Sequence, residues 1–154
     1  ITKIEAARIS TAAGCHMIIC DGRDPEPLLR LEKGAPCSCF IATETPHAAR
    51  KQWIAGALTP RGTIAVDVGA AHALRRGKSL LPAGVVAVDG QFDRGDLIAV
   101  EDQAGRVIGH GLSSYNAGDA AKIKGHKSRE IETMLGYRGR DEMIHADNLV
   151  VIDN

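Results

Sequence analysis

The chain has 154 residues, of which 44% are hydrophobic and 25% are charged, and its 19 basic and 19 acidic side chains give a formal net charge of zero. This composition is typical of a soluble globular chain. A neutral total argues against a protein that binds nucleic acid over its whole surface. Because aromatic residues make up only 3% of the chain, the core must consist mainly of Val, Ile, Leu and Ala.

Residues 1–46 predict an alternation of helices and strands. Thr2 and Glu5 have the spacing of a capping box, which predicts a helix over residues 2–13. The following pattern predicts a strand over 15–20, a helix capped by Asp24 with Pro25 in its first position and its end at Glu32, and a strand over 38–42. This texture is typical of the edge of an α/β sheet. So few residues cannot bury a sheet face, so we expect either missing sequence or a partner chain.

Residues 46–57 predict a helix or a turn-rich linker, and residues 58–62 predict a break. Trp53 is the only tryptophan, and we expect it to pack between the two parts of the chain. The sequence therefore predicts three segments: an α/β remnant over 1–46, a linker helix over 47–59 and a second domain over 60–154.

From residue 63 the pattern changes to short strands and turns. Strands are predicted over 63–67, 84–90, 96–102, 106–113 and 148–153, and short helices over 69–77, from Asn116 or Asp119 to 123, and over 128–135. We expect Asp67 to cap the first of these helices. Five short strands with small helical insertions suggest a closed or nearly closed small barrel, because closure removes exposed sheet edges.

No signal peptide, transit peptide or long apolar span is visible, so we expect a cytoplasmic chain with no membrane partner and with reduced thiols. Cys37 and Cys39 would point to the same face of a strand, but they lack the two-residue spacer of zinc knuckles. We therefore expect no metal site. We also expect Cys15 and His16, beside an apolar run, to be packed residues rather than ligands.

Residues 66–100 resemble a PUA domain, the small barrel named after pseudouridine synthases and archaeosine transglycosylases. The resemblance rests on Asp67-x-Gly69-Ala70, Ser79-Leu80-Leu81-Pro82-x-Gly84 and Gly90-x-Phe92-x-Arg94-Gly95-Asp96. It implies a mainly β pseudo-barrel with short helices.

Nearly the whole chain resembles the C-terminal part of bacterial glutamate 5-kinases, in which an amino-acid-kinase domain precedes a PUA domain. The matching segments keep their order and spacing: TKIEAARIST (2–11), ARKQWI (49–54), SLLPAGVVAVDGQF (79–92), GHGLSSYNA (109–117), SREIETMLGYRG (128–139) and IHADNLVV (144–151). The resemblance implies an enzyme that uses Mg²⁺ and transfers the γ-phosphoryl group of ATP to the side-chain carboxylate of glutamate, at the first step of proline synthesis.

The resemblance also implies a role for the first residues. The family's kinase domain carries a Gly-Gly-Met-x-Thr-Lys motif, of which Ile1-Thr2-Lys3 retains the tail. Thr2 and Lys3 are accordingly expected to contact the ATP phosphates, although Lys3 taken without the family is an exposed lysine of a first helical turn. The motif glycines and every upstream strand are absent from this sequence. We therefore expect no catalytic residue, no bound ATP or Mg²⁺ and no kinase activity in this chain alone.

An alternative hypothesis is a stand-alone PUA-type RNA-binding module without catalysis. Gly69 and Ala70 form a small-residue helix start that can approach a phosphate, and Arg75, Arg76 and Lys78 can add backbone contacts. Few aromatic residues are available for stacking on bases, which weakens this hypothesis.

A third hypothesis is a pure oligomerisation module, in which the exposed faces of residues 2–13 and 16–20 drive association. Within a glutamate 5-kinase, the PUA part would have a regulatory or assembly role. The expected partners are thus the rest of the kinase domain, a second copy of the chain in a homo-oligomer, and RNA.

Overall fold

The structure is a computed structural model that describes residues 2–23, 25–56 and 59–152. The chain divides into two compact units, residues 1–50 and 51–154, and helix α3 (Pro46–Gly56) spans the division. The boundaries drawn from the sequence, at residues 46 and 60, stay predictions. None of the helices in the described ranges combines the length and the hydropathy that crossing a bilayer requires.

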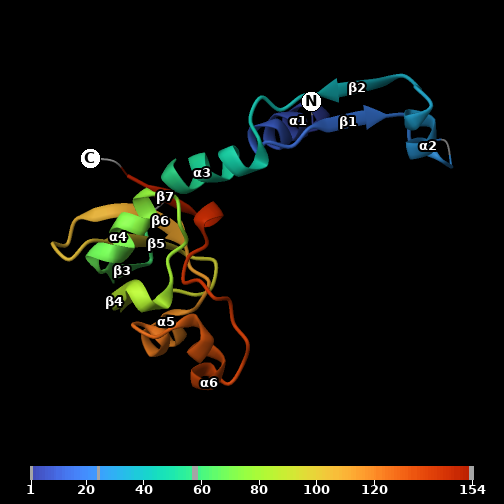
Figure 1. The fold of residues 1–154 in the computed structure, drawn as a ribbon. Helices are drawn as coiled ribbons and strands as arrows, with labels where there is room; N and C mark the ends of the chain where they lie inside the picture. Colours follow the sequence, from blue (N-terminus) through green and yellow to red (C-terminus); the bar gives the residue numbers. More distant parts are fainter. Residues whose placement is uncertain (1, 24, 57–58, 153–154) are drawn as a thin grey trace. The chain divides into compact units, whose positions relative to one another are not determined.

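The first unit alternates helices and strands, as expected from its sequence. Its elements in chain order are α1 (Thr2–Ala12), β1 (Met17–Cys20), α2 (Pro27–Glu32) and β2 (Cys37–Phe40). The two strands form an antiparallel hairpin in which Met17 lies opposite Phe40 (Figure 1). Gly14 joins α1 to β1 with a φ of +76°, and a Cβ at this position would lie 2.4 Å from the backbone nitrogen of Pro46.

Two local expectations for this unit are wrong, and a third is not tested. Helix α2 begins at Pro27 rather than Pro25, because Pro27 is the proline that fills the first helical turn. The predicted cap, Asp24, lies outside the described residues. Cys15 and His16 are exposed rather than packed, since they precede β1 instead of belonging to it.

The second unit is built on a five-stranded sheet. Its strands are β3 (Gly62–Val66), β4 (Val85–Gly90), β5 (Leu97–Glu101), β6 (Val107–Leu112) and β7 (Leu149–Val151), arranged in the order β4-β3-β5-β6-β7. The β3–β5 pair is parallel and the other pairs are antiparallel. Strands β4 and β7 are the two edges, so the pairing seen among the described residues does not close the sheet. The predicted mainly β fold with short helices is confirmed.

Short helices complete the second unit. They are α4 (Val68–Arg75), η1 (Pro82–Gly84), α5 (Ala117–Ile123), η2 (Ser128–Glu130), α6 (Ile131–Leu135) and η3 (Ala146–Asn148). Asn116 caps α5 by accepting a hydrogen bond from the N–H of Asp119, and Gly136 ends α6 with a φ of +77°. Helices α5 and α6 lie together next to β4 (Figure 1).

The main core of the second unit is aliphatic, as the composition predicted. Its fully buried side chains come from the strands, from α4 and α5 and from the segment before β7, and they include Ile64, Val66, Leu74, Leu80, Ile98, Val100, Ile123, Met143 and Ile144. A smaller cluster joins Ile54 of α3 to Leu97 and Leu112. Ile54 is fully buried, whereas Trp53 is 55% exposed, so the expectation that Trp53 is packed is wrong. Neighbouring helical residues point in different directions, and Ile54 faces the sheet.

Candidate functional site

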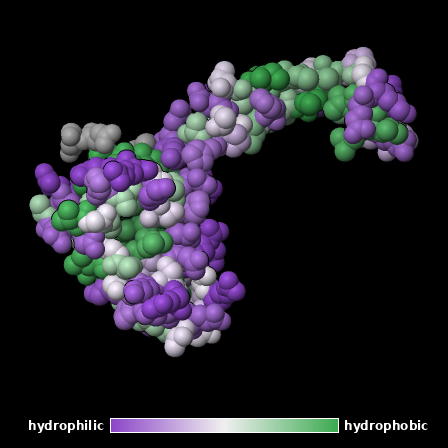
Figure 2. All heavy atoms as spheres, in the orientation of Figure 1, coloured by the Kyte–Doolittle hydropathy of each residue, from purple (hydrophilic) through white to green (hydrophobic). Residues whose placement is uncertain are grey.

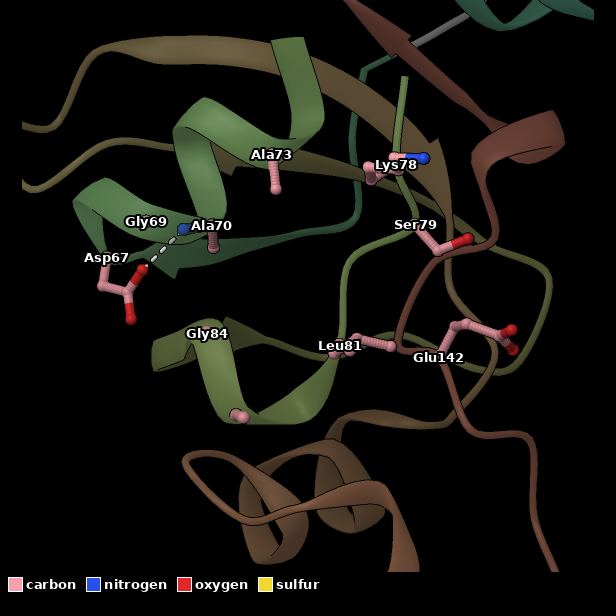
Figure 3. Close-up of a pocket in the computed structure, with 10 residues that line it drawn as sticks. Asp67, Gly69, Ala70, Ala73, Lys78, Ser79, Leu81, Gly84 and Glu142 are labelled. Atoms are coloured by element: carbon pink, nitrogen blue, oxygen red, sulfur yellow. Dashed lines mark hydrogen bonds between the residues drawn. The ribbon is translucent and has the colours of Figure 1, made fainter. Parts of the chain in front are cut away.

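A groove lies between α4 and η1 in the second unit (Figure 3). Helix α4 forms one wall and begins at Asp67, whose backbone is extended with φ −74° and ψ 171°. The Oδ1 atom of Asp67 accepts a hydrogen bond of 2.6 Å from the backbone N–H of Ala70. This is the N-cap predicted from the sequence. Ala71 and Leu74 of the same helix are buried, which fixes the helix to the core.

The other wall is the single turn η1. Its first residue, Pro82, is buried, and the preceding Leu81 is 47% exposed at the groove. Gly84 lies so close to α4 that a Cβ on it would be 2.5 Å from the Cβ of Ala70. The carbonyl of Gly84 accepts a hydrogen bond of 3.0 Å from the backbone N–H of Asp67. The absence of a side chain at Gly84 therefore sets the distance between the two walls.

A segment from near the C-terminus completes one end of the groove. Leu80 donates its N–H to the carbonyl of Ile144 at 2.9 Å, and its own carbonyl accepts from the N–H of Met143 at 2.8 Å. The Oγ atom of Ser79 accepts a further bond of 3.0 Å from the N–H of Ala146. These bonds place Glu142 at the same end as Lys78 and Ser79 (Figure 3).

The groove has a volume of about 620 Å³, within the range of about 300–1,000 Å³ that is typical of ligand sites. Its lining is mainly small or apolar and consists of Asp67, Gly69, Ala70, Ala73, Lys78, Ser79, Leu81, Ala83, Gly84 and Glu142. The lining thus contains two carboxylates and one ammonium group. No cysteine or histidine is among these residues, and the Ser79 hydroxyl is hydrogen-bonded to the N–H of Ala146. The arrangement favours binding over catalysis.

The structure brings together three of the five residues predicted for RNA binding. Gly69, Ala70 and Lys78 line the groove, whereas Arg75 and Arg76 are exposed at the end of α4 and are not part of the lining. The N–H of Ala70, which we expected to face a phosphate, is already bound to the Asp67 carboxylate.

The residues expected to contact ATP lie in the first unit. Thr2 and Lys3 begin α1, and both are exposed. Within the described ranges, no group of three or more His, Cys, Asp or Glu side chains is arranged to hold a metal ion. The described residues therefore do not supply a complete ligand set for a metal ion on their own, and the nucleotide contacts of Thr2 and Lys3 stay predictions.

Sequence reasoning did not assign Glu142 to the groove. Nothing in the residues around Glu142 signals its position, because hydrogen bonds between Leu80 and the residues after Glu142 place it there. Ser79 and Leu81 could be singled out from the sequence, since both belong to the Ser-Leu-Leu-Pro segment on which the PUA resemblance rests.

The second unit matches a known domain family. Residues 62–135 match the PUA domain. The described part of this chain contains a PUA domain. Except for Glu142, the groove lies within the matched range. One solved structure that is similar is a PUA domain from Aeropyrum pernix K1, a tartrate complex. It is 29% identical, the alignment covers 55% of this chain and 42% of the solved chain, and the TM-score is 0.40.

The similarity to curated proteins extends beyond the PUA domain. The chain is 54% identical over 150 residues to a glutamate 5-kinase of Rhodopseudomonas palustris strain TIE-1, which covers 97% of this chain and 40% of the relative. It is 51% identical over 151 residues to a glutamate 5-kinase of Paramagnetospirillum magneticum strain AMB-1, which covers 98% of this chain and 41% of the relative. The predicted resemblance to the C-terminal part of glutamate 5-kinases is confirmed. The chain spans about two fifths of the length of these relatives.

Proposed function

We propose that this chain acts as the C-terminal part of an enzyme that transfers the γ-phosphoryl group of ATP to the side-chain carboxylate of L-glutamate. Its identity of 54% over 97% of the chain carries the proposal. The match includes the residues before the PUA domain, which favours this function over that of a stand-alone PUA module.

The surface of the first unit supports a role as part of a larger domain. Large apolar side chains are exposed on both of its helices: Ile4 is 61% exposed, Ile9 is 64% exposed and Leu28 is 72% exposed. Figure 2 shows such hydrophobic residues on the surface of residues 1–50. The buried side chains of this unit are small, namely Ala7, Ala42 and Ala49. Exposed apolar surface of this kind is typical of a protein interface. The partner that we propose is the rest of the kinase domain.

We also propose that the chain alone is inactive. The proposed enzyme uses ATP and Mg²⁺, and Thr2 and Lys3, the residues expected to contact the nucleotide, are both exposed at the start of α1. Phosphoryl transfer depends on a donor and an acceptor held in line by several groups. We therefore assign no catalytic step to the residues described.

A comparison of two proteins tests this proposal. The gene product at its natural length and the 154-residue chain are each incubated with ATP, Mg²⁺ and glutamate, and the acyl phosphate is trapped with hydroxylamine. We expect product from the first protein and none from the second. Turnover by the short chain overturns its inactivity, and absence of turnover by the natural-length protein overturns the kinase function.

RNA binding by the PUA groove is a second candidate function, because Gly69, Ala70 and Lys78 line one groove. The test is a titration with a structured RNA hairpin over a series of salt concentrations. The logarithm of the RNA-binding constant is plotted against the logarithm of the salt concentration. If Lys78 contacts a phosphate, Lys78→Ala makes the negative slope of this line shallower by about 1. The matched control is Lys124→Ala, which changes an exposed lysine outside the groove. Binding without a salt-dependent slope rules this function out.

Assembly into a homo-oligomer is the remaining proposal about partners. Val86 is 52% exposed on the edge strand β4, where a second copy could contact it. Sedimentation of the natural-length protein with and without residues 60–154 tests it. An unchanged oligomeric state after the deletion excludes the PUA domain from assembly.

A further inference from the structure

Three of the four cysteines share one face of the β1–β2 hairpin. Cys37 and Cys39 are two residues apart on β2, so their side chains point to the same side. Cys20 lies directly opposite Cys37 on β1 and therefore points to that side as well. Cys15 precedes the hairpin. All four thiols are free.

Cys37 and Cys39 are in direct contact. Their Sγ atoms are 3.6 Å apart and share a hydrogen bond, and both residues are exposed. The hydrogen bond to Cys39 raises the pKa of the Cys37 thiol, and burial and the charges of Cys39 and Cys20 raise it further. Either sulfur can be the donor of this hydrogen bond, so either cysteine of the pair can attack first once it has lost its proton.

The surroundings of the pair favour redox chemistry over metal binding. A structural zinc site needs four ligands, and no group of even three suitable side chains is assembled among the described residues. Two exposed thiols in contact have the arrangement of an attacking and a resolving cysteine.

We propose that Cys37 and Cys39 form a redox-active dithiol that reacts with a low-molecular-weight disulfide. One of the two cysteines, as its thiolate, attacks one sulfur of the external disulfide, which forms a mixed disulfide and releases one external thiol. The other cysteine then loses its proton and attacks the Sγ atom of the first, which forms the Cys37–Cys39 bond and releases the second external thiol. The two protein thiols lose two electrons and two protons, and the external disulfide is reduced to two thiols.

Strand geometry makes this bond readily reversible. Residues two apart on a strand have Cα atoms about 6.6 Å apart, and disulfides usually join Cα atoms about 4.4–6.8 Å apart. The Cα–Cα distance between Cys37 and Cys39 is therefore near the upper limit for a disulfide. Formation of the bond draws the two residues together, so β2 can no longer be fully extended. Strained, exposed disulfides are easily reduced. We expect oxidation to loosen the hairpin, so amide hydrogen exchange rises in β1 and β2 and stays unchanged in β5 of the PUA domain.

Peptide mapping of the natural-length gene product tests the proposal. The protein is treated with oxidised glutathione, free thiols are alkylated, and the protein is digested with trypsin. Cleavage after Lys33 and Arg50 leaves Cys37 and Cys39 together in peptide 34–50, and cleavage after Arg8 and Arg23 leaves the other two cysteines in peptide 9–23. We expect peptide 34–50 to lose the mass of two hydrogens and to regain it with dithiothreitol. An unoxidised peptide 34–50, or a link between the two peptides, overturns the proposal.

Single substitutions test whether both thiols are needed. In Cys37→Ser the second thiol is missing, so we expect a glutathione adduct to accumulate on Cys39. In Cys39→Ser we expect an adduct to accumulate on Cys37 for the same reason. The matched control Cys15→Ser leaves the Cys37–Cys39 bond unchanged. An adduct on peptide 34–50 that persists equally in the unsubstituted protein contradicts the proposed dithiol.

Discussion

The carboxylate of Asp67 and the backbone N–H of Ala70 are joined by a 2.6 Å hydrogen bond at the start of α4. The bond satisfies a donor that the helix itself leaves unbonded, and it places a negative charge where a phosphate would otherwise bind. The same bond thus stabilises the helix and weakens the groove as a site for anions.

Loss of this cap is expected to destabilise the PUA domain. Asp67→Ala removes the acceptor for the Ala70 N–H and should lower the free energy of unfolding by about 1 kcal/mol. Asp67→Asn retains a capping oxygen and should lie within a few tenths of a kcal/mol of the unsubstituted chain. Urea denaturation followed by circular dichroism measures both. If both variants lose the same free energy of unfolding, the capping role of Asp67 is contradicted.

The close approach of Gly84 to Ala70 predicts a strong effect of one added methyl group. Gly84→Ala places a Cβ 2.5 Å from that of Ala70 and should cost about 1–3 kcal/mol of stability. The double variant with Ala70→Gly should recover part of this loss, which a double-mutant cycle detects.

Gly118→Ala in α5 is the matched control for the Gly84 substitution. The nearest atom to its new Cβ, Oδ1 of Asn116, lies at an ordinary 3.4 Å, so the higher helix propensity of alanine should maintain or raise stability. A loss equal to that of Gly84→Ala would show that the contact with Ala70 is not the cause.

The burial of Ile54 predicts that α3 is held on the PUA sheet by this side chain. Ile54→Ala leaves a cavity beside Leu97 and Leu112 and should cost about 2–5 kcal/mol. Trp53→Ala removes a larger side chain that is 55% exposed, and it should cost less. Thermal unfolding by circular dichroism compares the two variants. A greater loss from Trp53→Ala contradicts the observed orientation of the helix.

A hydrogen bond of 2.8 Å from the Tyr137 hydroxyl to the Asp119 carboxylate predicts two shifts with pH. The bond to Asp119 raises the pKa of Tyr137 to about 12, and the bond to Tyr137 lowers the pKa of Asp119 below its ordinary value. The Tyr137 contribution to stability is therefore complete below pH 10 and is lost as the pH rises towards 12. The Asp119 contribution is present at neutral pH and is lost as the pH falls through its lowered pKa.

Ultraviolet titration of the phenols measures the first shift. Asp119→Asn removes the charge that holds the Tyr137 proton, so the pKa of Tyr137 should return towards 10. Burial raises the pKa of Tyr115, the only other tyrosine, and Tyr115 should still titrate late in this variant. If the pKa of Tyr137 is unchanged in Asp119→Asn, the hydrogen bond to Asp119 is not the cause of its raised value.

Local signals in the sequence predicted most elements of the PUA domain. Asp67 caps the helix that it was expected to cap, Asn116 rather than the alternative Asp119 begins the next helix, and Gly136 ends the last one, because each acts on residues at most four positions away. The five strands were recognisable from short apolar runs between turns.

Features that depend on distant residues were not predictable in the same way. Glu142 reaches the groove through hydrogen bonds made by Leu80, and no pattern around either residue encodes that pairing. Which side of α3 is buried depends on the sheet it meets, so Trp53 was expected inside and Ile54 is the residue found there. Pro25 and Pro27 are both acceptable in a first helical turn, and local preference does not choose between them.

The backbone bridge between Leu80 and Ile144 has a consequence for biosynthesis. It joins residues that are far apart in the sequence, and both side chains belong to the same buried core. Pairings between residues so far apart in the chain form slowly, because a long loop must close before they stabilise anything. A ribosome must therefore release Ile144 before the PUA core can be completed, and a product that ends before Ile144 would expose Leu80 and its neighbours to proteases and chaperones.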